Sequence, residues 1–138
     1  MFRTEWELAG ASRAGGVEPL EAIAVQLEAL TRWNERVLGH FWHAGRPIPP
    51  LYESGVRYAL EPRGERWLDC VRVLELGRGD CEDLATWRAA ELRLGGDPGA
   101  VCMFSARPRG SGRLIHIIVQ RGDGTLEDPS RALGMGRE

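Results

Sequence analysis

The chain has 138 residues, of which 43% are hydrophobic and 28% are charged, and its formal net charge at pH 7 is −2. This length is sufficient for one core and too short for two ordinary domains, so we expect a single domain over residues 1–138. The small net charge, with basic residues scattered along the chain, argues against a nucleic-acid-binding protein and against a polybasic membrane-binding surface.

The cysteines and the hydropathy pattern indicate the cellular compartment in which the protein is expected. Cys70, Cys81 and Cys102 are few and include no C-x-x-C pair, so they form neither a disulfide framework nor a zinc-finger spacing. The N-terminal sequence lacks the apolar core of a signal peptide, and no apolar run approaches the roughly 20 residues that cross a bilayer. We therefore expect a cytoplasmic protein without a membrane partner, or one packaged with a larger particle.

The first half of the chain predicts one long helix and several extended segments. Residues 3–9 alternate loosely and predict a short strand, followed by a glycine-rich turn at 15–16. Apolar residues recur with helical period from about 18 to 42, and Pro19 suits the first turn of a helix. Residues 46–53 contain three prolines and must be extended, and 55–60 predict a short strand or an extended arm.

The second half predicts two more helices and then an antiparallel meander. After a turn at 61–65, residues 66–76 predict a second helix. Asp80 and Asp83 approximate a capping box that begins a third helix over 81–94, which stops at Gly95-Gly96. Strands are predicted at 100–106 and 113–120, and a turn at 121–125 leads to a short strand that ends at Pro129. This order predicts an α+β fold with one helix laid on a small antiparallel sheet.

Three chemically active side chains come in a suggestive order. Cys81 leads the apolar stripe of the third helix, at the positive end of its dipole. The period of two places Leu114, His116 and Ile118 on one face of their strand, and we expect that face to pack on the helix. Asp128 follows on the next strand. A nucleophile at a helix start, a base on one strand and an orienting acid on the next is the arrangement of a Cys-His-Asp triad.

Other interpretations of these residues remain open. Asp123 is a rival acid, although it lies in the turn itself. Cys81, His116 and Cys102 could instead be ligands of a zinc ion. Asp80, Glu82 and Asp83 could hold a hard cation, but three acids at a helix start are more simply explained as capping residues.

The motifs Gly79-Asp80-Cys81, His116 in LIHIIV and Asp128-Pro129-Ser130 resemble those of the transglutaminase-like superfamily. This papain-like group includes transglutaminases, peptide N-glycanases and bacterial cysteine proteases. The resemblance covers residues 77–130. The stretches PPLYESGVRY, RWLD, GDCEDLA and EDPSRALGM are also similar to small transglutaminase-like proteins encoded among phage structural and tail genes.

The resemblance implies a papain-like core over about 66–130, with Cys81 as nucleophile, His116 as general base and acid, and Asp128 orienting the histidine. It implies a cysteine-dependent acyl-transfer enzyme acting on a protein or peptide, and we expect hydrolysis rather than crosslinking. No metal or organic cofactor is implied. The alternative is a non-catalytic assembly protein of a phage-like particle that keeps the fold.

The sequence departs from the superfamily pattern in two ways. Ile117 follows the histidine, where many members have a small residue and then tryptophan. The backbone N–H of Cys81 can supply one oxyanion donor. The second donor is not evident, and the candidates are Trp67, Tyr52 and Tyr58.

Overall fold

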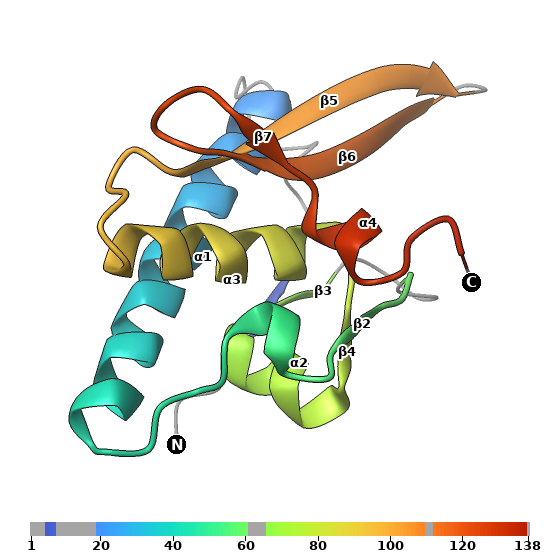
Figure 1. The fold of residues 1–138 in the computed structure, drawn as a ribbon. Coiled ribbons are helices and arrows are strands. Elements are labelled where there is room, and N and C mark those ends of the chain that lie inside the picture. The colour runs from blue at the N-terminus through green and yellow to red at the C-terminus, as the bar shows by residue number, and fades with distance from the viewer. Residues whose placement is uncertain (1–4, 8–18, 61–65, 110–111, 138) are drawn as a thin grey trace.

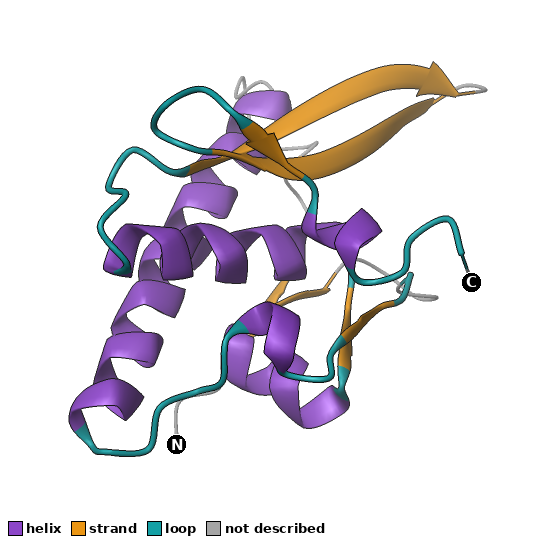
Figure 2. Ribbon diagram, viewed as in Figure 1, coloured by secondary structure: helices purple, strands orange, loops and turns teal. Residues whose placement is uncertain are grey.

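The structure is a computed structural model that describes residues 5–7, 19–60, 66–109 and 112–137 (Figure 1). In chain order its elements are β1 (Glu5–Glu7), α1 (Pro19–His43), the 3-10 helix η2 (Leu51–Glu53), β2 (Arg57–Tyr58), β3 (Arg66–Leu68), α2 (Cys70–Leu76), β4 (Arg78–Gly79), α3 (Cys81–Leu94), β5 (Val101–Arg109), β6 (Gly112–Gln120), β7 (Leu126–Glu127) and α4 (Pro129–Ala132). Helices and small sheets together give the α+β class that the sequence predicted (Figure 2).

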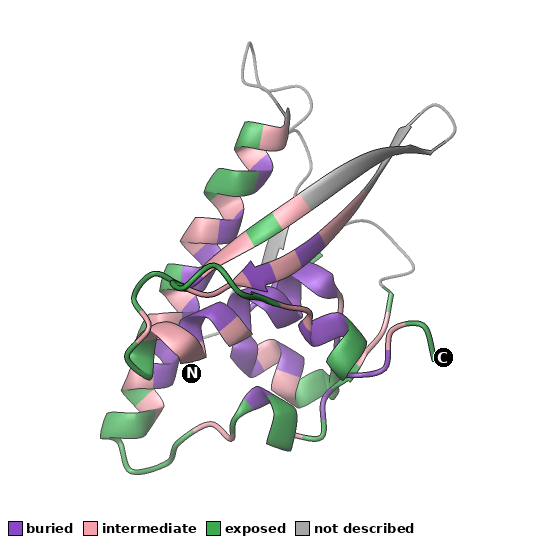
Figure 3. Ribbon diagram, turned by 45° about the horizontal axis from the view of Figure 1, so that its top comes forward, coloured by how far each residue is buried: buried purple, intermediate pink, exposed green. Residues whose placement is uncertain are grey.

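Helix α3 is the central element, and its bounds are those predicted. Its N-cap is Asp80, and the predicted capping box is formed, because the Asp83 carboxylate also accepts from the backbone N–H of Asp80 at 3.0 Å. One side of α3 packs with α2 through Leu84 and Trp87, and another packs with α1 and the sheet through Ala85. Burial on more than one side explains why buried residues run along most of α3 (Figure 3).

The predicted meander is present as an antiparallel sheet in the order β5-β6-β7. The face of β6 that packs on α3 is not the predicted one. Ile117 and Val119 are buried in the cluster that contains Cys81, with Ile115 packed against it. The prediction that the face of His116 and Ile118 covers the helix was therefore wrong. The wholly apolar alternate set is the one that enters the core.

The segment 66–76 was predicted to be one helix. In the structure it is a strand followed by a shorter helix. Residues Arg66–Leu68 pair with β1 as β3, and α2 begins only at Cys70. Asp69 separates the two, because its side chain caps α2 by accepting from the N–H of Arg72 at 3.0 Å. The backbone N–H of Leu68 donates to the buried carboxylate of Asp83 at 2.8 Å, which ties β3 to the start of α3.

Other boundaries differ by smaller amounts. Residues 51–53, expected to be extended, form η2, and β5 continues to Arg109. The last strand ends at Glu127, because Asp128 caps α4. The segment 78–79, expected only to break a helix, pairs in parallel with β2 as β4. The turns at 15–16 and 61–65, most of the strand at 3–9 and the hairpin tip at 110–111 lie outside the described residues. Within the described part of the chain, no helix is both long and apolar enough to cross a membrane.

Candidate active site

His116 and Asp128 form the hydrogen-bonded pair that the sequence predicted. Nε2 of His116 lies 2.8 Å from Oδ2 of Asp128. An ionised carboxylate can only accept, so the ring donates from Nε2, and its other nitrogen, Nδ1, is the basic one in the neutral tautomer. The Asp128 carboxylate is itself held as the N-cap of α4, where it accepts from the N–H of Arg131 at 3.2 Å.

Cys81 is the first residue of α3, and its thiol is engaged with the neighbouring acid. The residue is 9% exposed, and its Sγ donates to Oε2 of Glu82 at 3.3 Å. Burial, followed by the negative charges of Glu82 and Asp80, raises the pKa of the Cys81 thiol well above its usual range. Among the described residues the thiol makes no hydrogen bond to His116, and it is turned toward Glu82 in this structure.

The thiol nevertheless lies beside the strand segment that carries His116. The Ile117 side chain packs in the same buried cluster as Cys81, and the backbone N–H of Ile117 opposes the rise in the thiol pKa. His116 belongs to the alternate face of β6, where its ring meets Asp128 just after β7. The thiol and the His116–Asp128 pair therefore adjoin neighbouring residues of β6 but belong to opposite faces of the strand.

Glu82 is the residue whose importance the sequence did not indicate. It is only 8% exposed, although it was expected to be a capping residue at a helix start. Burial and the charges of Asp83 and Asp80 raise the pKa of its carboxyl well above the usual range. The signal available in the sequence was its position directly after the cysteine.

Replacing Glu82 with Gln is expected to stabilise the protein by an amount that grows with pH. Near pH 4 Glu82 is protonated in the folded and unfolded states, so the variant and wild type differ little. Above the unfolded pKa, about 4.3, the unfolded chain releases this proton while the folded protein retains it, and wild-type stability falls. The gain is about 1.4 kcal/mol for each unit by which the folded pKa is raised.

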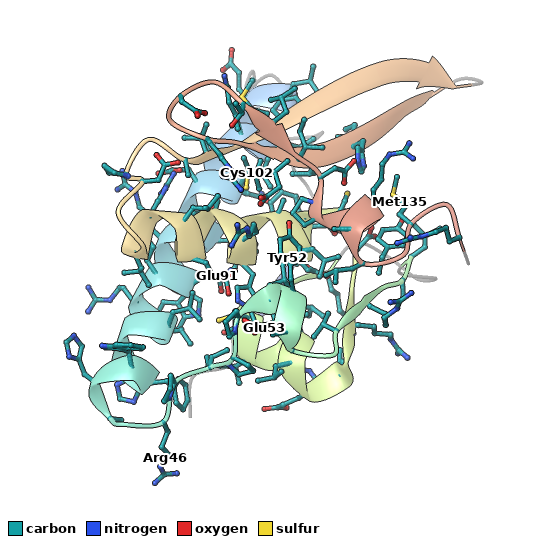
Figure 4. The ribbon with its side chains drawn as sticks, in the orientation of Figure 1. Arg46, Tyr52, Glu53, Glu91, Cys102 and Met135 are labelled. Carbon is teal, nitrogen blue, oxygen red and sulfur yellow. The ribbon has the colours of Figure 1, made fainter. Side chains whose placement is uncertain are left out.

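Urea denaturation of the Glu82→Gln variant and of wild type, at intervals from pH 4 to 8, measures this difference. Glu53→Gln is the matched control, because Glu53 is exposed on η2 (Figure 4). A stability difference that is the same at every pH would show that the Glu82 carboxyl titrates normally in the folded protein.

A charged cluster fixes β7 against α3, next to the His116–Asp128 pair. Arg88 of α3 donates from Nε to Oε2 of Glu127 at 2.6 Å, and Nη2 of Arg121 donates to Oε1 of the same carboxylate at 2.5 Å. The Arg88 guanidinium also lies over the Tyr52 ring, 4.9 Å from its centroid. Glu127 immediately precedes Asp128, so these contacts hold the strand end that presents the acid.

The expected oxyanion donors are arranged differently from the prediction. The backbone N–H of Cys81 donates to Oδ1 of Asp80 at 2.7 Å, so it is occupied in this structure. Of the three side chains considered as second donor, Trp67 packs in the same buried cluster as Cys81. Tyr58 packs against the other cluster, and Tyr52 stacks with Arg88.

The structure places the two residues of the alternative interpretations, Asp123 as the acid and Cys102 as a zinc ligand, away from His116. Asp123 is exposed, and its Oδ1 accepts from the N–H of Thr125 at 2.9 Å within the turn, away from His116. The Cys102 thiol contacts the Thr31 hydroxyl at 3.7 Å.

Among the described residues, the ligand atoms that gather are those of Asp80, Cys81 and Glu82, within 4.8 Å of one another, and not a zinc set with His116 and Cys102. Asp83 lies outside this group. These three could contact a cation, but in this structure they bond to each other and to the backbone of α3.

No known protein family, curated protein or solved structure matches the chain at a significant level.

Proposed function

We propose that this protein is a cysteine-dependent acyl-transfer enzyme with a transglutaminase-like core, in which Cys81, His116 and Asp128 form the triad. The observation that carries the proposal is the 2.8 Å contact between Nε2 of His116 and Oδ2 of Asp128, twelve residues apart, on the strand stretch that the Cys81 thiol adjoins. The start of a 14-residue helix is a suitable position for a thiol nucleophile.

The chemistry requires one movement of the thiol. The Cys81 thiol has to leave Glu82 and reach Nδ1 of His116 around the edge of β6, because the two side chains belong to opposite faces of this strand. The thiol proton passes to Nδ1, and the thiolate attacks the carbonyl carbon of a peptide or amide. The imidazolium, held by Asp128, returns the proton to the leaving amine, and a thioester remains. His116 then takes a proton from a water molecule, whose oxygen attacks the thioester carbonyl. The C–S bond breaks, the carboxylic acid leaves, and the proton returns to the Cys81 sulfur, so the overall reaction is hydrolysis of a peptide or amide bond.

The alternative function is a non-catalytic assembly protein of a phage-like particle. The observation that favours it is the buried thiol, bonded to Glu82 rather than to His116. A cysteine fixed in this way is a packing residue, and the His116–Asp128 pair then serves only to join β6 to α4.

Labelling with iodoacetamide at pH 7.5, followed by peptide mapping, separates the two functions. In the enzyme, Cys81 is alkylated faster than Cys70 and Cys102, whose thiol pKa values burial also raises. We expect His116→Ala to slow the reaction at Cys81 by about tenfold or more, because the base is lost. The rates at Cys70 and Cys102 are the internal control, and both should be unchanged. A Cys81 rate that equals theirs, or that His116→Ala leaves unaltered, would favour the assembly protein.

A further inference from the structure

Two arginines are paired side by side on neighbouring strands just before the cysteine helix. Arg57 of β2 is the register partner of Arg78 of β4. Residues in register project from the same face of strands that are about 4.8 Å apart. Like charges placed opposite each other in this way are destabilising. Arg78 is separated from Cys81 only by Gly79 and Asp80, so this unfavourable pair lies next to the N-terminus of α3.

Among the described residues, no carboxylate neutralises the guanidinium of Arg57 or of Arg78. Both residues are exposed, and within the described part of the chain neither forms an ion pair with a carboxylate. Other arginines of this protein are matched, such as Arg93 with Glu28 at 2.7 Å and Arg88 with Glu127 at 2.6 Å. Arg57 and Arg78 thus differ from these matched arginines, since no carboxylate of the described residues pairs with them.

Further arginines extend this positive surface toward Asp128. Strand β2 meets the end of α4 where the N–H of Tyr58 donates to the carbonyl of Leu133 at 3.0 Å. A Cβ built on Gly134 would lie 2.8 Å from Nη2 of Arg57, so this guanidinium rests against the turn after α4. Arg131 lies on α4 itself, where its Nε is 3.5 Å from Oδ2 of Asp128, and Nη2 of Arg137 donates to the carbonyl of Arg131 at 3.1 Å. Figure 1 shows β2, β4 and α4 side by side.

We propose that this arginine rim, formed by Arg57, Arg78, Arg131 and Arg137, binds an acidic segment of a peptide or protein substrate. The inference rests on the proposed function, because the rim joins the start of α3 to the helix that follows Asp128. A carboxylate bound between the side chains of Arg57 and Arg78, whose backbones are in register, offsets their like charges and is held by fork-like hydrogen bonds. The rim then determines which substrates are presented to Cys81, and acidic residues near the scissile bond are preferred.

The test uses the full-length Cys81→Ala protein and fluorescent peptides, so that binding is measured without chemistry. One peptide is rich in Glu, and the other has Gln at the same positions. At 50 mM salt we expect the Glu peptide to bind about tenfold more tightly. Arg57→Gln and Arg78→Gln should each weaken its binding about two- to fivefold, the range for single exposed ion pairs. Arg46→Gln is the matched control, because Arg46 is exposed at the far end of α1 (Figure 4).

Thermal unfolding gives a second readout. Removal of either paired arginine should raise the melting temperature while it weakens binding, since the repulsion disappears in the free protein. Equal affinity for the two peptides, equal loss in Arg46→Gln, or retention by anionic phospholipid vesicles without a preference for the Glu peptide would overturn the proposal. Peptide binding is measured in the Cys81→Ala protein and does not depend on catalysis. An inactive triad would leave this binding intact, whereas a rim that does not bind acidic segments would abolish it.

Discussion

Replacing Asp83 with Ala is expected to lower the free energy of unfolding by about 3 kcal/mol or more, the largest stability effect of any polar substitution considered for this protein. The Asp83 side chain is 1% exposed, and its two oxygens accept from the backbone N–H groups of Leu68 and Asp80 at 2.8 and 3.0 Å. Hydrogen bonds to a charged group contribute about 1.5–3 kcal/mol each. Their loss leaves the N–H of Leu68 buried without a partner.

Urea denaturation followed by circular dichroism measures this loss. Asp83→Asn is the matched variant, because an amide has nearly the same shape and keeps one acceptor oxygen. We expect it to lose about half as much stability as Asp83→Ala. If Asp83→Ala lies within about 0.5 kcal/mol of wild type, Asp83 does not fix β3 and the start of α3 together.

The location of the cysteine helix was predictable because its signals are local. Asp80 and Asp83 form a capping box within one turn, and a glycine pair follows Leu94, so both ends are defined by adjacent residues. The split at Asp69 had a similar local signal, since an aspartate precedes an apolar run. It was missed because Trp67 and Leu68 continue the apolar pattern of the helix backwards into the strand.

The orientation of β6 could not be settled by periodicity alone. Both alternate sets of residues on this strand are largely apolar, and a period of two only separates them without saying which is buried. The set that contains His116 carries the polar residue, and that is the set turned away from the core. The presence of a polar residue in one set was therefore the signal that identified the exposed face. It places His116 at the margin of the core rather than within it.

Two features of the site arise only from tertiary structure. The burial of Glu82 comes from the packing of other elements around α3, which no local pattern encodes. The pairing of Arg57 with Arg78 joins two-residue strands that are distant in sequence, and such strands are too short to have a periodic signal.

For the proposed cysteine enzyme, replacing Asp128 with Asn is expected to reduce acyl transfer by about 10³-fold or more while the fold is retained. Asn caps a helix about as well as Asp, so the bond to the N–H of Arg131 and the start of α4 should survive. The amide oxygen can still accept from Nε2 of His116. What is lost is the negative charge that stabilises the imidazolium formed when the thiol proton is taken, together with the preference for the tautomer that leaves Nδ1 basic.

The release of p-nitrophenolate from p-nitrophenyl acetate, which reports acylation of Cys81, measures this effect when wild type and variant are compared under the same conditions. Cys81→Ala gives the background rate. Asp123→Asn is the matched control, because this aspartate lies in the preceding turn and its carboxylate bonds to Thr125 and not to His116. It should react like wild type, and both variants should melt close to the wild-type temperature. Wild-type acylation in Asp128→Asn would mean that the His116–Asp128 bond is only a structural link between β6 and α4, and the assembly-protein function would then be the better account of the fold.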